Sequence, residues 1–93
     1  MANFVIKKSG EKEPFDPTKI ENSIRAAAID AGLTPEKIDE IANRVAKIVI
    51  EAVAEKDEVN TSEIKEKILA ELDVVEPAVA DAWRKFEEAK QNQ

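Results

Sequence analysis

Three lysines near the N-terminus are the side chains of this chain best suited to hold an anion. Lys7 and Lys8 follow a short run of β-branched and aromatic residues, and Lys19 comes soon after the turn expected at Gly10. At physiological salt, charges further apart than about 8 Å are largely screened from each other. The lysines can therefore attract a phosphate chain despite the formal net charge of −6. The competing interpretation is an exposed sheet edge, where lysine is common because it prevents aggregation.

The same composition offers little for catalysis. The chain has no cysteine and no histidine, which removes disulfides, iron–sulfur clusters, the common zinc sites and the commonest general base. Its serines therefore have no histidine partner, and its carboxylates form no recognisable acid–base pair. We predict a protein that is not an enzyme and has no metal site of its own.

Charge and hydropathy also bear on partners and location. The acidic balance argues against nucleic acid, because proteins that bind nucleic acid usually present a basic face to the phosphates. No stretch approaches the roughly twenty apolar residues that span a bilayer, and the N-terminus lacks the pattern of a signal peptide. We therefore expect no nucleic acid partner, no membrane and a cytoplasmic location.

The lysines are predicted to sit on a hairpin. Residues 3–9 have strand composition, Gly10 permits a tight turn, and residues 11–15 form a second short strand. Lys7 and Lys8 would then point to opposite faces of the first strand.

Two helices are predicted to follow the hairpin. Asp16 and Thr34 each precede a proline, which is typical of a helix cap followed by the first helical residue. Apolar residues recur at helical spacing between residues 20 and 31 and between residues 38 and 53. Gly32 stands where a left-handed residue commonly ends a helix.

The remainder is predicted to add a short strand and two more helices. Val59 and Asn60 form the strand, and Thr61 or Ser62 caps the third helix. Pro77 begins the fourth helix, which carries two aromatic residues that we expect in the core. These are Trp83 and Phe86. A chain of this length fits one domain, so we expect residues 1–93 to form a single α+β domain, a four-helix bundle capped by a small three-stranded sheet.

The order of these motifs resembles the ATP-cone, a regulatory domain type of ribonucleotide reductases and of their repressor. Residues 5–10 (Val-Ile-Lys-Lys-Ser-Gly) and residues 13–20 resemble its signature. Residues 59–64 resemble its Val-x-Thr-x-x-Ile junction, and residues 79–86 resemble its closing helix. The resemblance covers nearly the whole chain and implies a helical bundle under a small sheet, with the nucleotide held between them.

The resemblance also implies a role for particular residues, in three groups. Phosphates would be held by Lys7 and Lys8 with the help of Lys19; the base would be flanked by Val5, Phe15 and Ile20; and polar groups of adenine or ribose would be read by Glu13, Asp16 and Thr61. Each has a competing role, because the apolar residues belong in a core without any ligand and Asp16 and Thr61 suit helix caps.

Two positions depart from the family pattern. A usual Lys-Arg-Asp-Gly reads Lys-Lys-Ser-Gly at residues 7–10, and lysine lacks the bidentate grip of arginine. Late in the last helix, where the family has a cluster of basic residues, this chain has the acids Glu87 and Glu88. Lys85 or Lys90 would replace it, and Lys90 is the candidate that we assign to the nucleotide.

The function implied is a non-catalytic sensor of ATP or dATP, bound together with Mg²⁺. Such a sensor would act allosterically, through self-association or through a protein partner in trans. The alternative is an acidic helical module that keeps the fold and binds a protein without nucleotide. Added ATP would separate the two, because only a nucleotide-binding native state is stabilised by it.

Overall fold

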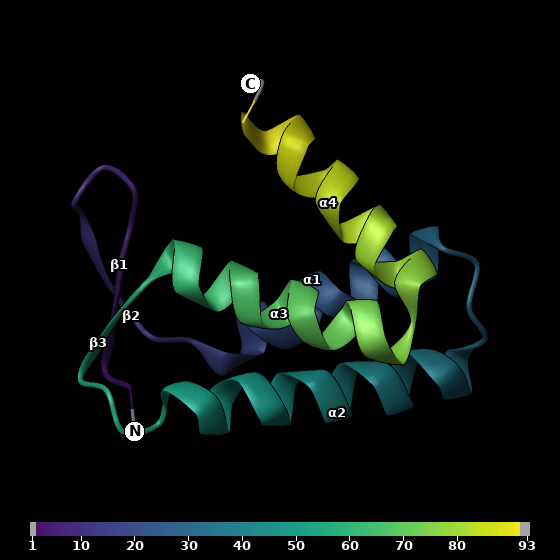
Figure 1. The fold of residues 1–93 in the computed structure, drawn as a ribbon, viewed down its shortest axis with the longest axis horizontal. Coiled ribbons are helices and arrows are strands. Elements are labelled where there is room, and N and C mark those ends of the chain that lie inside the picture. The colour runs from purple at the N-terminus through teal and green to yellow at the C-terminus, as the bar shows by residue number, and fades with distance from the viewer. Residues whose placement is uncertain (1, 92–93) are drawn as a thin grey trace.

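Four helices form the body of the part that the structure describes, and a three-stranded sheet lies at one end of that body (Figure 1). The structure is a computed structural model that describes residues 2–91. Its elements run in the order β1 (Phe4–Ile6), β2 (Lys12–Pro14), α1 (Pro17–Asp30), α2 (Pro35–Val53), β3 (Glu58–Asn60), α3 (Thr61–Val75) and α4 (Pro77–Gln91). The predicted α+β fold, a four-helix bundle with a small sheet, is confirmed.

The first two helices begin where the sequence predicted. Asp16 caps α1, because its Oδ1 accepts a hydrogen bond of 3.0 Å from the backbone N–H of Thr18. Thr34 caps α2, where its Oγ1 accepts from the N–H of Lys37 at 3.3 Å. A proline follows each cap, where its missing N–H leaves no helical hydrogen bond unmade. Gly32, just after α1, has a φ of +82°, the left-handed conformation that commonly ends a helix.

The third helix begins differently from the prediction. α3 starts at Thr61 itself, after Asn60, whose side chain makes no capping hydrogen bond. The prediction that Thr61 or Ser62 caps this helix is therefore wrong. The reason is strand pairing, since β3 pairs with β1 as far as Asn60. The Thr61 hydroxyl instead donates to the carbonyl oxygen of Ile6 at 3.0 Å.

The sheet has the order β2-β1-β3, with β1 antiparallel to β2 and parallel to β3. The hairpin between β1 and β2 turns at residues 7–10, where the Gly10 N–H donates to the carbonyl of Lys7 at 2.8 Å. Gly10 has a φ of +90°, which a residue with a side chain adopts only under strain. Lys7 and Lys8 therefore lie in the turn after β1, and the prediction that they alternate across a strand is wrong.

The helices pack in a ring around one hydrophobic core. α1 packs against α2 and α4, and α3 packs against the same two helices. Ile24, Val45, Val49, Leu72 and Val79 are fully buried, one or more from each helix. Their positions follow from the apolar stripe of each helix, which must face the interior.

The two aromatic residues of α4 have different surroundings. Trp83 is buried as predicted, and its Nε1–H donates to the Ser23 hydroxyl of α1 at 3.3 Å. Phe86 was also expected in the core, but 40% of it is exposed. That prediction is wrong because the end of α4 diverges from the other helices (Figure 1), although the next residue, Glu87, still reaches Lys65 of α3.

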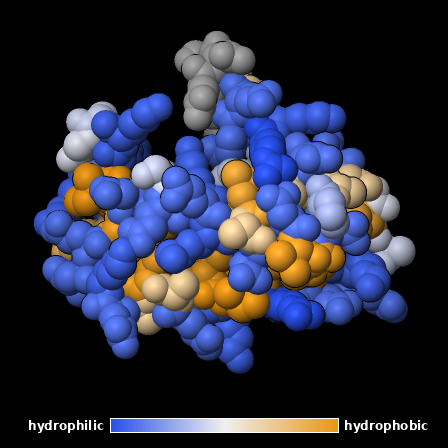
Figure 2. Space-filling view, in the orientation of Figure 1, coloured by the Kyte–Doolittle hydropathy of each residue, from blue (hydrophilic) through white to orange (hydrophobic). Residues whose placement is uncertain are grey.

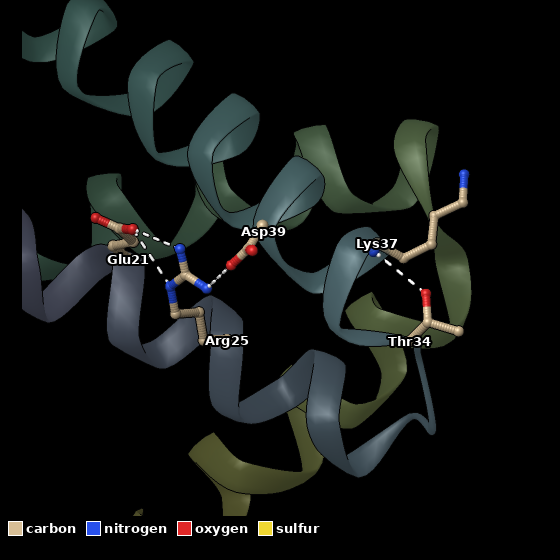
Figure 3. A network of polar contacts seen from close by, with 5 residues as sticks. All are labelled: Glu21, Arg25, Thr34, Lys37 and Asp39. Atoms are coloured by element: carbon tan, nitrogen blue, oxygen red, sulfur yellow. Dashed lines mark hydrogen bonds and ion pairs between the residues drawn. The ribbon is translucent and has the colours of Figure 1, made fainter.

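A surface network fixes the first two helices against each other (Figure 3). Arg25 of α1 donates from Nε and Nη2 to Glu21 Oε1, at 3.3 and 2.9 Å, and from Nη1 to Asp39 of α2. Exposed ion pairs contribute little to stability, so we assign this network to orienting α1 on α2.

No helix within residues 2–91 has the length and apolar character needed to cross a membrane. Hydrophilic residues cover most of the face in Figure 2, and hydrophobic ones gather in a band across its middle.

Candidate functional site

The sheet brings two distant segments of the chain together. In the parallel pair of β1 and β3, Ile6 lies opposite Asn60. The next residues along are Lys7, at the start of the hairpin turn, and Thr61, at the start of α3. The hydrogen bond from the Thr61 hydroxyl to Ile6 holds this junction at 3.0 Å. The hairpin tip and the first turn of α3 therefore border the same surface.

A cavity of about 200 Å³ lies on one side of this junction. Its walls are Val5, Lys7, Glu13, Pro14, Phe15, Asp16, Lys19, Ile20, Thr61 and Ile64. Apart from Lys8 and Lys90, every residue predicted to contact a ligand lines it. The structure thus gathers residues from β1, β2, α1 and α3 around one space.

A larger cavity, of about 710 Å³, adjoins the first. It is lined by Ile6, Lys7, Lys8, Ser9, Asn60, Thr61, Ser62 and Lys65. Its volume is in the range of roughly 300–1,000 Å³ that is usual for small-molecule sites. Lys7 and Thr61 line both cavities, so the two form neighbouring parts of one site.

The smaller cavity has mostly apolar walls, with two carboxylates and two lysines among its lining residues. Ile20 and Ile64 are buried, and Val5 and Phe15 are half-buried against the core. Flat apolar surfaces of this kind suit an aromatic ring, and the carboxylates would accept hydrogen bonds from its amino or hydroxyl groups. Asp16 keeps its capping role, since Oδ1 holds the Thr18 N–H.

The larger cavity has the chemistry of an anion site. Three lysines and several hydroxyls line it, together with the first residues of α3. Asn60 makes no side-chain capping bond there, and the first N–H groups of a helix point toward an anion placed at its N-terminus. The positive end of the helix dipole adds to the lysine charge.

An ion pair already occupies part of this site. Lys7 Nζ lies 2.8 Å from Glu13 Oε1. Its hydrogen bond to Glu13 raises the pKa of Lys7, and the same bond lowers the pKa of Glu13. The charge of Lys19 lowers the pKa of Glu13 further, though by less. Lys7 is therefore held charged at the border of the two cavities, and a phosphate would compete with Glu13 for it.

The cavities include residues that were not among the predicted contacts, notably Ile64, Ser62 and Lys65. Lys65 follows Thr61 by one helical turn and so lies on the same face of α3. That spacing could have indicated Lys65 from the sequence, but only if α3 had been known to begin at Thr61, directly after β3 ends at Asn60.

The end of α4 carries the remaining predicted contact. The side chain of Lys90 lies outside the part of the chain that the structure describes. Of the two acids that depart from the family pattern in this helix, Glu87 reaches the site, because its Oε2 lies 2.8 Å from Lys65 Nζ. Among residues 2–91, no three or more acidic side chains converge as a protein-built metal site.

Comparison with known proteins adds a family and a set of relatives. Residues 3–89 match the model of the ATP cone domain. The chain is 34% identical over 89 residues to the transcriptional repressor NrdR of Clostridium kluyveri, covering 91% of this chain and 58% of the relative. NrdR of Mesorhizobium japonicum is 33% identical over 90 residues, covering 92% and 55% respectively. NrdR of Cereibacter sphaeroides is 44% identical over a shorter stretch of 43 residues.

These relatives overturn the expectation of no nucleic acid partner. They are transcriptional repressors, so the chain is similar to proteins that act on DNA. The acidic composition described only the charge of these 93 residues, which span 58% and 55% of the two long matches. The net charge of a domain indicates whether that domain itself contacts phosphates. It does not decide whether a protein that contains the domain binds DNA.

ATP-cone domains bind ATP or dATP and are regulatory, as are the repressors that contain them. The match spans nearly the whole chain, and the helices, sheet and adjoining cavities agree with it. This chain belongs to the ATP cone domain family and is a nucleotide-sensing regulatory domain.

Proposed function

We propose that the domain binds ATP or dATP across the two cavities and acts as a non-catalytic allosteric sensor. The observation that carries this proposal is the shared border of the cavities at Lys7 and Thr61. On one side of that border the walls are mostly apolar, with two carboxylates and Lys19, and on the other they carry Lys8, Lys65 and serine hydroxyls. An adenine nucleotide has the same division, with a flat base at one end and a charged chain at the other.

In the proposed complex the base occupies the smaller cavity. Val5, Phe15 and Ile20 flank its ring, and Ile64 closes the α3 side. Glu13 accepts a hydrogen bond from the adenine amino group or the ribose. Asp16 does the same through the oxygen that does not cap α1, so both of its predicted roles are compatible.

The phosphates then lie in the larger cavity. Lys7, Lys8 and Lys65 supply positive charge from two sides of it, Lys19 assists from the smaller cavity, and the Thr61 hydroxyl lies at the border. Mg²⁺ bound with the nucleotide would offset part of the phosphate charge, which favours binding to a chain whose net charge is −6. Lys90 is a further phosphate contact that we propose from the family pattern.

The output of the sensor requires two states with different nucleotide affinity, since a ligand that binds both equally shifts neither. We propose that these states differ in self-association or in binding a partner in trans, and that residues 1–93 act as one domain. Because the matched relatives are transcriptional repressors, control of gene expression in the cytoplasm is the role that we assign to the signal.

A thermal melt tests the nucleotide proposal directly. The protein is heated with Mg²⁺ and increasing ATP, with GTP as the control ligand. At a hundredfold excess over Kd, binding adds about 2.7 kcal/mol to the free energy of unfolding, which raises the melting midpoint by several degrees.

Matched variants locate the effect. Lys7→Ala/Lys8→Ala should abolish the shift, whereas Lys37→Ala/Lys47→Ala, which removes two exposed lysines from α2, should retain it. Absence of any shift at millimolar ATP would refute nucleotide binding and favour the acidic protein-interaction module. If ATP still raises the melting midpoint of Lys7→Ala/Lys8→Ala, nucleotide binding stands but its assignment to these two lysines is refuted.

A further inference from the structure

An ion pair ties the end of α4 to the proposed phosphate cavity. Lys65 Nζ, which belongs to the cavity wall, lies 2.8 Å from Glu87 Oε2. The Glu87 side chain is 15% exposed and that of Lys65 is 36% exposed, so the pair is more shielded from water than the hairpin pair of Lys7 and Glu13, at 43% and 35%. An acidic residue thus holds one of the cations that the phosphates would need.

The position of Lys65 within the site decides which ligands meet this pair. Lys7 and Thr61 line both cavities, whereas Lys65 lines only the larger one. Lys65 also lies one helical turn after Thr61 along α3, next to Ile64, which lines the smaller cavity. In the proposed complex, a phosphate chain that starts at the border meets Lys7 there and must extend into the larger cavity to meet Lys65.

We propose that Glu87 is a specificity-determining residue, which makes the site sensitive to the length of the phosphate chain and links triphosphate binding to the end of α4. This inference rests on the proposed function, since it assumes that a nucleotide occupies the two cavities. A monophosphate leaves the pair of Lys65 and Glu87 intact. A triphosphate takes Lys65 for its terminal phosphate and brings negative charge close to Glu87.

The expected movement is confined to the last turns of α4. Earlier in the helix, Val79 is fully buried and Trp83 is bonded to Ser23 of α1, so this part stays in place. Beyond Trp83, Arg84 still pairs with Asp73 of α3 and Glu87 with Lys65, but Phe86 is 40% exposed and the end of α4 diverges from the other helices (Figure 1). Repulsion between Glu87 and the phosphate would shift these turns and change how Phe86 is presented.

Glu88 provides a matched control for Glu87. It is exposed, follows Glu87 directly and carries the same charge. Neutralising either residue changes the net charge equally, but only Glu87 is paired with a cation of the cavity wall. A difference in nucleotide affinity between the two variants therefore comes from the ion pair and not from the change in net charge.

The test is calorimetric titration of wild type, Glu87→Gln and Glu88→Gln with AMP, ADP and ATP, each with Mg²⁺ at fixed ionic strength. Glu87→Gln should tighten ATP binding by about three- to fivefold, the range of a partly exposed ion pair. It should tighten ADP less and leave AMP unchanged. Glu88→Gln should change all three by less than twofold, because an exposed charge is screened.

A second pair of variants checks that Glu87 acts through Lys65. In a Lys65→Ala background, Glu87→Gln should tighten ATP binding much less than in wild type, because the competed cation is gone and only the repulsion between Glu87 and the phosphates remains. Hydrogen exchange provides the structural readout: residues 84–89 should exchange faster with ATP bound than with AMP bound, while residues 77–83 stay equally protected in both. Melting each variant without nucleotide identifies any loss of folding.

The outcomes separate the inference from the proposed function. If wild type binds no adenine nucleotide, the proposed function fails and the inference falls with it. If wild type binds ATP but Glu87→Gln matches Glu88→Gln, or tightens AMP and ATP equally, the inference alone is overturned. Slower exchange at residues 84–89 with ATP would also overturn it.

Discussion

The helical body and the sheet end of this domain are held together in different ways. The body encloses side chains without any exposed surface, such as Val45 and Leu72. The sheet end has three strands of three residues each, and Phe4 on its central strand is 38% exposed. Short strands with little burial open more readily than a packed core. Folding stability therefore resides mainly in the helices, and the proposed binding chemistry resides where the structure is least constrained.

The largest expected effect is a break in the body. Leu72→Ala removes a fully buried side chain of α3 and should lower the free energy of unfolding by about 2–5 kcal/mol, because it removes apolar contacts and leaves a cavity. Denaturant unfolding measures the change. Val74→Ala, on the same helix at a position 82% exposed, should alter stability by less than about 0.5 kcal/mol. Equal effects of the two variants would contradict a core centred on the helices.

The next effect tests a residue that belongs to both regions. Asp16→Ala deletes the cap of α1 and should lower the free energy of unfolding by about 1 kcal/mol. Asp16→Asn caps nearly as well, so it should retain stability and weaken only nucleotide binding through the lost charge. Melts and titrations of both variants give the answer. If Asp16→Asn binds ATP like wild type, Asp16 is a cap alone.

A comparable effect is expected where the sheet joins α3. Thr61→Val keeps the shape of the side chain but removes the hydroxyl that donates to Ile6, so it should lower the free energy of unfolding by about 1 kcal/mol. It should also weaken ATP binding, because the junction borders both cavities. Ser62→Ala is the neighbouring control for stability alone, since Ser62 also lines the larger cavity. A Thr61→Val protein with unchanged stability and affinity would show that the junction does not depend on this bond.

The smallest effect concerns the pH dependence of the hairpin pair. Bonding to Lys7 lowers the pKa of Glu13 below its ordinary value of 4.5. The unfolded chain therefore binds a proton at this residue before the folded chain does, so the stabilisation is present above the ordinary value and is lost as the pH falls through the lowered pKa. Melting midpoints of wild type should fall more steeply below about pH 4.5 than those of Glu13→Gln. Parallel profiles would show that the pair does not contribute to stability.

Most of the fold followed from signals within a few residues of each other. Asp16 and Thr34, each before a proline, located two helix starts, and apolar spacing identified the buried faces of α1 and α2. Where the predictions were wrong, a distant partner decided the outcome. Pairing of β3 with β1 made Thr61 the first residue of α3 instead of its cap. Phe86 is exposed because the end of α4 diverges from the other helices.

The candidate site was predicted in the same uneven way. The order of the motifs indicated most of the residues that line the smaller cavity, although their contacts with a nucleotide remain predictions. The sequence did not indicate Lys65. The expectation of no nucleic acid partner was wrong because it rested on the composition of these 93 residues, whereas the relatives are longer proteins that repress transcription.

The sequence by itself determined where α1, α2 and α4 begin, which faces α1 and α2 bury and that the chain belongs among ATP-cones, because these depend on neighbours within one or two turns and on motif order. Only the tertiary structure decided that Lys7 lies beside Thr61, that Lys65 faces Glu87 and that two cavities share a border. Such contacts join residues far apart in the chain. They depend on strand register and helix packing, which no local pattern specifies.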